Sequence, residues 1–409
     1  MRYGVLTALE RDSEVTAFDA LGNPLDIAVD GRRFAALRSL WESSEGGAYR
    51  ALGGTLTSVT QPGADGHVGA VDAHLLSADG RWKLDAQAMA SAAVDRRGIG
   101  AIGDVVFTPR QGRTHSLGIE AFDRDLDIND FGFLSRNDQV LFDYRFRERR
   151  TQFLVRNGWN LDGLLVSSGF FAEREWQFDD LSRLSVNVGL RPQRWDDRNS
   201  RGNGAFRVET RGVAEAEWSS NDARALSGGV RGGLRHEDLQ GLSFDLRAFL
   251  LWRPLDRFTA DLSLRYRDRD DWLVHRRDRE FATFDATEWR PSFTLDYFLS
   301  ARQQFRATMQ WVGVKAEEDG LLQIGPNGSL VDRPPVADGP DEDFSISSLV
   351  LQLRYRWEIA PLSDLFVVYT RGGTLDDAEG RGFSNMFSAS FDDPDQDQLV
   401  VKLRYRLGS

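Results

Sequence analysis

The sequence predicts an all-β protein, a transmembrane antiparallel up-and-down β-barrel of about 20 strands (18–22). Three observations predict this fold. Apolar and polar residues alternate with a period of two along many segments, the connections between these segments alternate between long and short, and aromatic residues gather at strand ends beside the short connections. We expect residues 1–409 to form one barrel domain.

The segment 242–266 shows the alternation most clearly. The apolar residues of its first half share one face: Leu242, Phe244, Leu246, Ala248, Leu250 and Trp252. After Pro254 the pattern resumes with Phe258, Ala260, Leu262, Leu264 and Tyr266. Because successive strand side chains point to opposite faces, this segment is predicted to be a hairpin with one apolar face and one charged face. Each strand is long enough to cross a bilayer at a tilt.

Similar segments run along the whole chain. The predicted strands are 2–9, 34–41, 49–60, 68–78, 81–92, 100–108, 114–122, 140–147, 151–159, 162–173, 182–191, 207–218, 224–236, 242–252, 258–266, 282–299, 303–316, 345–358, 366–371 and 399–407. The long connections are 10–32, 123–138, 191–204, 268–280, 317–343 and 372–396. Each long connection follows an odd-numbered strand, as in bacterial outer-membrane barrels with long extracellular loops and short periplasmic turns. The C-terminus is therefore expected in the periplasm.

Aromatic residues support this orientation. Trp41, Trp218, Trp252 and Trp357 fall at strand ends beside short turns. An aromatic girdle at the periplasmic membrane interface predicts that bias, whereas a general preference of strands for aromatic residues does not.

Composition excludes several classes of protein. A net charge of −12 and a pI near 5.1 disfavour nucleic acid as a partner. The chain has no Cys, so disulfides and thiolate metal sites are excluded. No apolar run approaches the length of a transmembrane helix. The five histidines show no metal-ligand spacing, and none lies in a motif with a nucleophile, so we expect neither an enzyme nor a bound cofactor.

Three stretches carry a resemblance to a known family. They are 127–138, then 175–179 with 196–202, and 351–358 continuing through 361–369. Together they resemble a bacterial barrel family designated domain of unknown function 5916. Its members usually carry a signal peptide and a β-sandwich similar to family-nine carbohydrate-binding modules ahead of the barrel.

The resemblance covers essentially the whole chain and implies that this chain is the barrel alone. The N-terminus fits that expectation, because Met1 leads directly into a strand and not into a basic and apolar signal. The signal peptide, the sandwich domain and the first strands are expected upstream. One departure is the ending Leu407-Gly408-Ser409, where barrels usually present an aromatic residue to the assembly machinery.

Charged residues on one face of the strands are the main functional candidates. The candidate lumen-lining residues are Arg207, Glu209, Arg211, Glu215, Asp245, Arg247, Asp261, Arg265, Arg354 and Arg404. A charge on the lipid face at mid-membrane costs about 2–4 kcal/mol, so these side chains should face inward. A barrel of this size is too wide for side chains to fill, which leaves room for water, a plug or cargo. A salt-bridge network that serves only the fold is the alternative explanation for the same charges.

The connection 123–138 is the candidate plug or binding loop. Its candidate residues are Asp127, Asn129, Asp130, Phe131, Phe133, Arg136, Asn137 and Asp138. We expect Phe131, Phe133 and Leu134 to be buried in the lumen, and the carboxylates to contact inward arginines. The acidic runs 338–343 and 392–397 have oxygen ligands suited to calcium, although solvated loops explain them better.

The leading functional hypothesis is an outer-membrane channel or translocation component for solutes in a Gram-negative bacterium. Its expected partners are outer-membrane lipid and the barrel-assembly machinery. Glycans are candidate solutes only because of the family resemblance. The alternative is a surface binding or adhesion protein with a plugged barrel as its anchor. An outer-membrane hydrolase would need a His beside Ser or Asp at the rim, and a soluble propeller would need shorter, repeated strands.

Overall fold

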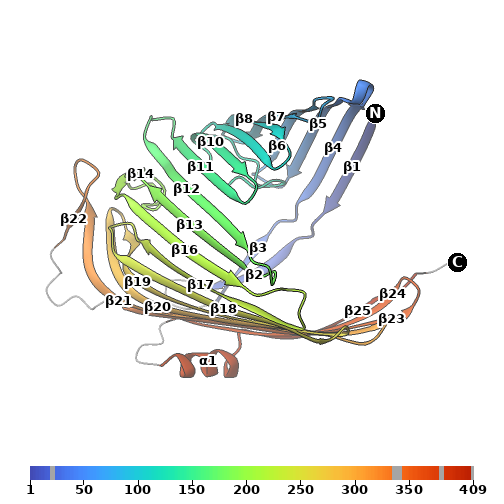
Figure 1. Cartoon of the computed structure of the whole chain (residues 1–409), viewed down its shortest axis with the longest axis vertical. Coiled ribbons are helices and arrows are strands. Elements are labelled where there is room, and N and C mark those ends of the chain that lie inside the picture. Colours follow the sequence, from blue (N-terminus) through green and yellow to red (C-terminus); the bar gives the residue numbers. More distant parts are fainter. Residues whose placement is uncertain (19–23, 334–342, 377–381, 407–409) are drawn as a thin grey trace. The chain divides into compact units, whose positions relative to one another are not determined.

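The computed structural model describes residues 1–18, 24–333, 343–376 and 382–406. The chain divides into two compact units, Met1–Phe170 and Phe171–Ser409, and each is described by itself. Figure 1 labels the elements along the chain.

The first unit is an antiparallel meander. Its elements are β1 (Arg2–Leu9), β2 (Ser13–Phe18), β3 (Pro24–Val29), β4 (Arg33–Ser43), the short 3₁₀ helix Glu45–Gly47, β5 (Tyr49–Thr60), β6 (Gly66–Leu76), β7 (Trp82–Ala93), β8 (Arg97–Arg110), β9 (Arg113–Phe122), β10 (Gln139–Glu148), β11 (Thr151–Trp159) and the first half of β12 (Leu165–Gln177). Strand β1 pairs with β4, and from β4 to β11 each strand pairs with the next along the chain. The β2–β3 hairpin forms a small sheet of its own.

The second unit continues the same pattern. Its elements are β13 (Arg183–Arg191), β14 (Arg194–Asp196), β15 (Phe206–Val208), β16 (Arg211–Ser219), β17 (Leu226–His236), β18 (Leu242–Leu255), β19 (Phe258–Arg277), β20 (Glu280–Ser300), β21 (Gln303–Ile324), β22 (Leu330–Asp332), β23 (Phe344–Ala360), β24 (Ser363–Asp376), α1 (Phe383–Asp392) and β25 (Gln396–Arg404). From β13 to β25, each long strand pairs antiparallel with the next long strand along the chain.

The predicted fold class is confirmed. Within the described residues the main sheet has 21 strands, and one of them, β22, has only three residues, which leaves twenty long strands. Each long strand overlaps one of the twenty segments predicted from the alternation. The predicted single domain stays a prediction.

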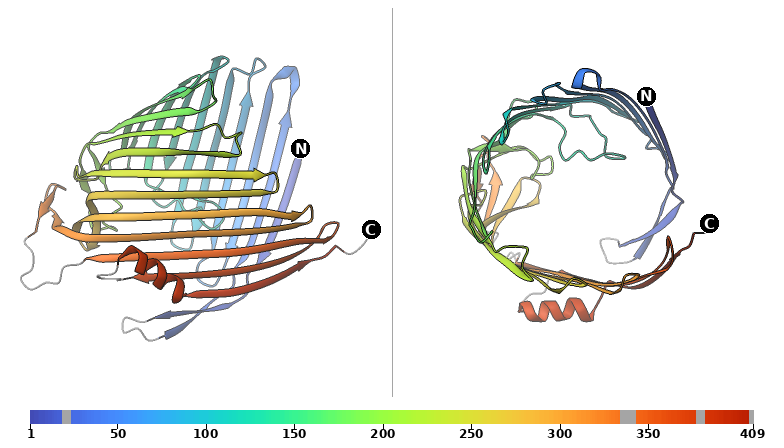
Figure 2. Two further views of the ribbon diagram at one scale, coloured as in Figure 1. Left: turned by 60° about the horizontal axis from the view of Figure 1, so that its bottom comes forward. Right: turned by 45° about the vertical axis from the view of Figure 1, so that its right-hand side comes forward.

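Strands β19, β20 and β21 are longer than the sequence predicts. They run for 20, 21 and 22 residues, so much of the predicted loops 268–280 and 317–343 is strand (Figure 2). Apolar side chains cover the extensions. Phe281 and Ile324 pack with Phe206 and Val208 of β15, and Phe284 packs with Trp272 and Phe344. The extensions therefore carry cores of their own, which a loop would lack.

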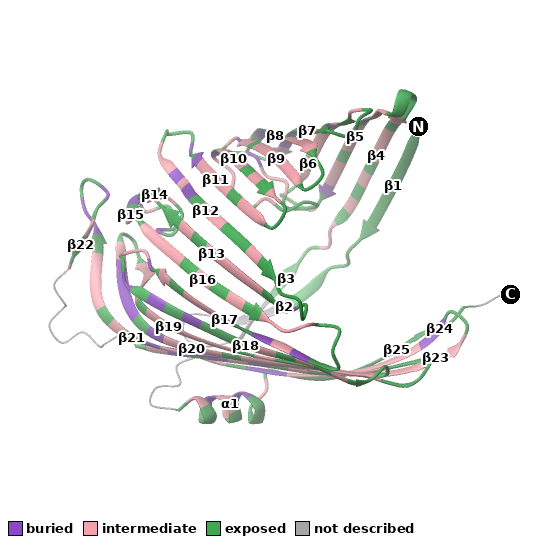
Figure 3. Ribbon diagram, viewed as in Figure 1, coloured by how far each residue is buried: buried purple, intermediate pink, exposed green. Residues whose placement is uncertain are grey.

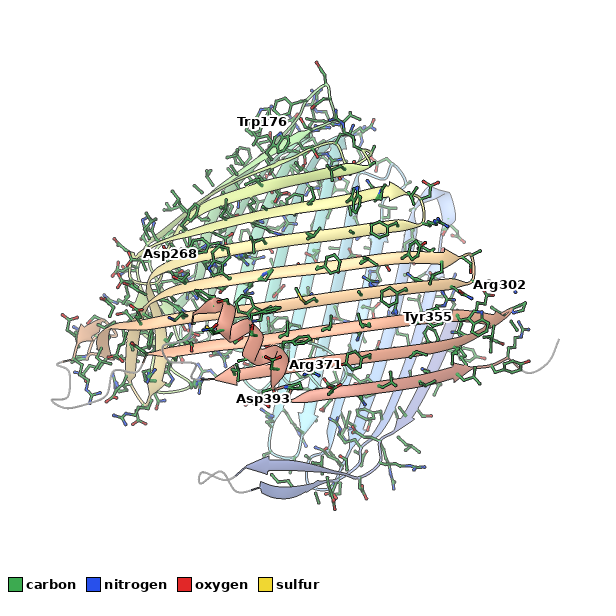
Figure 4. All side chains as sticks on the ribbon, turned by 90° about the horizontal axis from the view of Figure 1, so that it is seen from below. Trp176, Asp268, Arg302, Tyr355, Arg371 and Asp393 are labelled. Atoms are coloured by element: carbon green, nitrogen blue, oxygen red, sulfur yellow. The ribbon has the colours of Figure 1, made fainter. Side chains whose placement is uncertain are left out.

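Helix α1 lies in the predicted loop 372–396, against the apolar face of β21 and β23. Met386 is fully buried with Trp311 and Leu349. Ser347 accepts a hydrogen bond from Trp311 Nε1 at 2.9 Å and donates to the carbonyl of Met386 at 3.2 Å. Figure 4 shows the helix crossing the strands beside Arg371, whose Nε donates to the carbonyl of Phe391 at 2.8 Å. Among the described residues, no helix is both long and apolar enough to cross a membrane.

Candidate functional site

The two faces of the second unit's sheet have opposite chemistry. Leu246, Leu250 and Leu262 share the apolar face and are 39%, 41% and 43% exposed. On the other face, which we call the charged face, Asp245 and Glu288 are only 7% and 4% exposed. Figure 3 shows how exposure changes from residue to residue along the strands. These carboxylates are therefore buried while the leucines are exposed, which is the reverse of the distribution in a water-soluble protein.

Four arginines of the charged face stand in one row across four neighbouring strands. Arg231 of β17 is opposite Arg247 of β18, Arg247 is opposite Arg265 of β19, and Arg265 is opposite Arg290 of β20. We call these four residues the arginine row. Opposed strand residues have Cβ atoms about 4.5–5.5 Å apart, and like charges in such pairs oppose strand pairing.

Carboxylates lie diagonally to the arginine row. Glu215 of β16 pairs with Arg231 at 2.6 Å, and Asp245 of β18 pairs with Arg265 at 2.6 Å. Glu288 pairs with Arg290 on its own strand, with Oε1 2.5 Å from Nε. Two further arginines join these carboxylates: Arg235 lies 3.1 Å from Glu215, and Arg267 lies 3.3 Å from Asp245.

Arg247 is the exception within the row. Its Nε donates to Ser263 Oγ at 2.9 Å, and its guanidinium lies 5.7 Å from the ring centroid of Phe249. Within the described part of the chain it has no carboxylate at ion-pair distance. The arginine row also borders a hollow of about 360 Å³, whose other lining residues include Ser292 and Gln310. A charged, exposed guanidinium therefore faces this hollow without a neutralising partner.

A second ion pair lies beside the connection that joins β17 to β18. Glu237, in the connection between β17 and β18, accepts hydrogen bonds from Arg269 Nη2 at 3.0 Å and Arg269 Nε at 3.1 Å. Ser243 Oγ donates to the same carboxylate at 2.7 Å. Burial favours the neutral acid, but these bonds outweigh it and hold the pKa of Glu237 below its ordinary value.

Most of the candidate lumen-lining residues lie on the charged face as the alternation predicts. In the second unit these are Arg211, Glu215, Asp245, Arg247, Asp261, Arg265, Arg354 and Arg404. Arg404 pairs with the buried Asp364, which also binds Arg356 at 2.9 Å. Whether they line a lumen stays a prediction.

Arg207 and Glu209 do not lie on the long strand to which the sequence assigns them. Strand β16 begins at Arg211, and Arg207 belongs to β15, where it is opposite Trp195 in the separate β14–β15 hairpin. Its guanidinium stacks on that ring with a centroid distance of 5.0 Å. The alternation continues through this break, so the periodicity alone could not reveal it.

The connection 123–138 packs on the face of the first unit's sheet that carries Asp85 and Asp104, which we call the charged face of that unit. Leu126 is 1% exposed and packs with Met89 and Phe122, with Ile128 and Leu134 around them. The backbone N–H of Asp127 donates to Ser91 Oγ of β7 at 3.0 Å. The connection is therefore anchored chiefly by Leu126, and of the three residues expected to anchor it only Leu134 packs in this cluster.

Two expectations for this connection need correction. Phe133 is 86% exposed, and Phe131 is 38% exposed with its ring against Phe34 at a centroid distance of 5.6 Å. The buried positions are filled by Leu126 and Ile128, which leaves Phe133 outside. Asp127 pairs with Arg96 at 3.0 Å, so its partner comes from a neighbouring turn and not from an inward strand position.

The remaining candidates of this connection form a local network. Asn129 Oδ1 accepts from the backbone N–H of Leu134 at 2.8 Å, and Asp138 accepts from Arg124 at 3.1 Å. Asn137 donates to the carbonyl of Leu126 at 3.4 Å. Arg136 and Asp130 complete the candidate set, and Asp130 lies close to Gly66 of β6.

Calcium has no assembled site in the described residues, where no group of three or more His, Asp or Glu side chains could hold a metal ion. Of the acidic run 338–343, only Asp343 lies within the described residues.

Sequence reasoning missed Arg231, Arg290 and Glu288. Their strands were predicted, but their places in the row depend on the offset between neighbouring strands. The alternation could have placed each of them on the charged face, because each lies on the polar side of its own strand.

An up-and-down antiparallel sheet of twenty long strands, apolar on one face and charged on the other, has the fold class of a transmembrane β-barrel. The chain belongs to the family described as Domain of unknown function (DUF5916), whose model matches residues 55–408. This membership confirms the resemblance predicted from the sequence.

Among solved structures, the chain is similar to the alcaligin outer membrane receptor FauA from Bordetella pertussis. The TM-score is 0.46 and the identity 11%, over 98% of this chain. The chain spans 64% of the length of that receptor. None of the curated proteins compared matches the chain.

Proposed function

We propose that the chain forms a β-barrel in the outer membrane of a Gram-negative bacterium and acts there as a channel or translocation component for solutes. One observation carries the proposal: leucine side chains are solvent-exposed on one face of the sheet, whereas carboxylates are buried on the other. Exposed apolar surface on this scale needs an apolar partner. Lipid is that partner, because the apolar residues recur on strand after strand.

The orientation follows from the connections. Short turns such as Ala360–Ser363 lie at the end of the strands where the C-terminal strand β25 finishes, and the long connections lie at the other end. In outer-membrane barrels the short turns are periplasmic, so the C-terminus is periplasmic in this proposal. Lipid and the barrel-assembly machinery are the partners that such a chain requires.

The charged face supports a passage for solutes. In an aqueous lumen the partly paired arginines would keep their charge and would be accessible to a polar solute. Glycans remain candidate cargo on the basis of the family resemblance alone. The proposed role is not enzymatic.

Reconstitution tests the proposal. The protein is refolded in detergent, inserted into planar bilayers, and its single-channel conductance is measured. Stepwise conductance, with a shift in gel mobility on heating as the sign of a folded barrel, is the expected result. A protein that stays monodisperse in buffer without detergent would overturn the membrane assignment.

A surface-binding protein anchored by a plugged barrel is the second candidate. The packing of Leu126 on the charged face of the first unit favours it, because a connection bound there narrows any passage. A folded barrel without conductance, which conducts after deletion of residues 127–137, would support this alternative over an open channel.

A further inference from the structure

We propose that the arginine row, Arg231, Arg247, Arg265 and Arg290, is a binding site for a multiply charged oxyanion. The inference deepens the proposed function, because it names the class of solute that the charged face selects. It rests on the proposed function in that the ligand is taken to be a solute of the channel. The ligand is identified by its chemistry alone: at least two negative charges carried on oxygen atoms, as in phosphate esters and diphosphates.

The register of the strands is the first argument. Four guanidinium groups are placed side by side by direct opposition of their backbones across β17, β18, β19 and β20. Like charges in opposed pairs weaken strand pairing, so a sheet shaped only by stability would avoid three such pairs in succession. An anion that bridges neighbouring guanidinium groups removes this repulsion.

The counter-charges are the second argument. Glu215, Asp245 and Glu288 each bind one member of the row, but each also lies to one side of it. Glu215 and Asp245 are shared with a second arginine each, Arg235 and Arg267. Glu217 of β16 is opposite Arg231 at the edge of the row, which makes four carboxylates for six arginines. The carboxylates therefore position the guanidinium groups without neutralising the row.

Arg247 is the third argument. It is held by Ser263 Oγ at 2.9 Å and has no ion-pair partner among the described residues, although it stands between two other arginines of the row. Because only its Nε is used, its terminal N–H groups are left to donate. The planar guanidinium donates two parallel hydrogen bonds to an oxyanion, which a lysine cannot do in the same way.

The surroundings fit such a ligand. The hollow beside the row has a volume of about 360 Å³. It is lined by Ser263, Ser292 and Gln310, by the arginines, and by the two carboxylates paired with them, Glu215 and Asp245. These side chains can donate hydrogen bonds to oxygen atoms that the guanidinium groups do not reach. Charge, donors and space thus coincide on one part of the charged face.

Binding of inorganic pyrophosphate to the refolded protein in detergent tests the inference by isothermal titration calorimetry. Arg247→Gln is the informative variant, because it removes a guanidinium without leaving a carboxylate unpaired. Arg302→Gln is the matched control, since it makes the same charge change in the short turn between β20 and β21 (Figure 4). We expect Arg247→Gln to weaken binding about tenfold or more, the effect of losing charge-assisted hydrogen bonds, and Arg302→Gln to leave it within about twofold.

Equal affinity in Arg247→Gln and wild type, or no measurable binding by folded wild-type protein, would overturn the inference. If Arg247→Gln fails to fold, Arg247→Lys replaces it, and it should fold and bind more weakly than wild type.

Conductance separates this inference from the proposed function. A protein that conducts but neither binds pyrophosphate nor prefers anions in reversal-potential measurements defeats the inference and leaves the channel intact. A protein that binds pyrophosphate at the row but does not conduct defeats the channel and leaves the site.

Discussion

Replacing two neighbouring leucines of β18 by arginine tests the assignment of the sheet's faces. Leu250 lies on the apolar face and is 41% exposed, whereas Leu251 lies on the charged face opposite Asp261. The two residues are adjacent in sequence, so they share nearly the same depth in the membrane. Only the face differs between Leu250→Arg and Leu251→Arg.

The depth of Leu250 sets the expected magnitude. It is five residues from Leu255, where β18 ends at a short turn. At about 3.3 Å per residue and a tilt of about 40°, the distance is about 13 Å, close to the middle of an apolar band of about 25 Å. An arginine facing lipid at that depth costs about 2–4 kcal/mol, which lowers the folding equilibrium constant about 30-fold or more.

Leu251→Arg should behave differently, because its guanidinium would face the carboxylate of Asp261 across the ladder. We expect its free energy of unfolding to stay within about 0.5 kcal/mol of wild type. Urea titration of the protein in lipid vesicles, followed by tryptophan fluorescence, measures both variants. If Leu251→Arg is destabilised as much as Leu250→Arg, or more, the assignment of faces is wrong.

Three further predictions concern the connections. Gly98→Leu should displace the connection 123–138, because a Cβ at this position would meet the backbone of Leu126, and trypsin should then cleave the connection faster. Gly373→Leu should displace α1 from the sheet, because a Cβ at this position would meet the Ser390 carbonyl. The chain has no other cysteine, so Ser390→Cys can report the displacement, and its thiol should then react faster with a maleimide. The pKa of Glu237 is lower in the folded protein than in the unfolded chain, so ionised Glu237 stabilises the fold above the unfolded pKa of about 4.3. This stabilisation is lost as the pH falls through the folded pKa. Acid should therefore lower the urea midpoint less in Glu237→Gln than in wild type.

Controls for the glycine variants come from positions with open space. A Cβ at Gly4 or Gly232 would meet nothing within 4 Å, so leucine there should change neither trypsin cleavage of the connection nor the maleimide rate. A similar acceleration in Gly4→Leu would mean that the effect of Gly98→Leu is a general loosening of the fold.

The sequence predicts the strands well because a two-residue period records which side of a sheet is apolar. It predicts connections poorly where they fold on themselves. The strand extensions beyond Asp268 bury apolar residues on both faces, so Phe281 and Phe284 are covered without a simple alternation. Helix α1 was missed because Met386 and Ser390 anchor it through contacts with distant strands.

The candidate site could be predicted only in part. The two-residue alternation placed Asp245, Arg247 and Arg265 on one face. It could do so because the face on which a side chain lies depends only on its position within its own strand. The row depends on the offsets between strands, and these are set by connections whose length and turn conformation the alternation does not encode. The opposition of Arg231 to Arg247 and of Arg265 to Arg290 is therefore a property of the folded sheet.

That opposition has a consequence for how the sheet forms. Sliding β18 by two residues along β17 would keep every side chain on its present face and would place Asp245, in place of Arg247, opposite Arg231. Local charge attraction thus favours a misaligned hairpin, which makes this part of the sheet energetically frustrated. The native alignment must be imposed by the connection, where Gln240 adopts φ +74° and the N–H of Glu237 donates to the carbonyl of Gly241 at 2.7 Å. Changes in this five-residue turn should therefore shift the strands more readily than changes among the charges themselves.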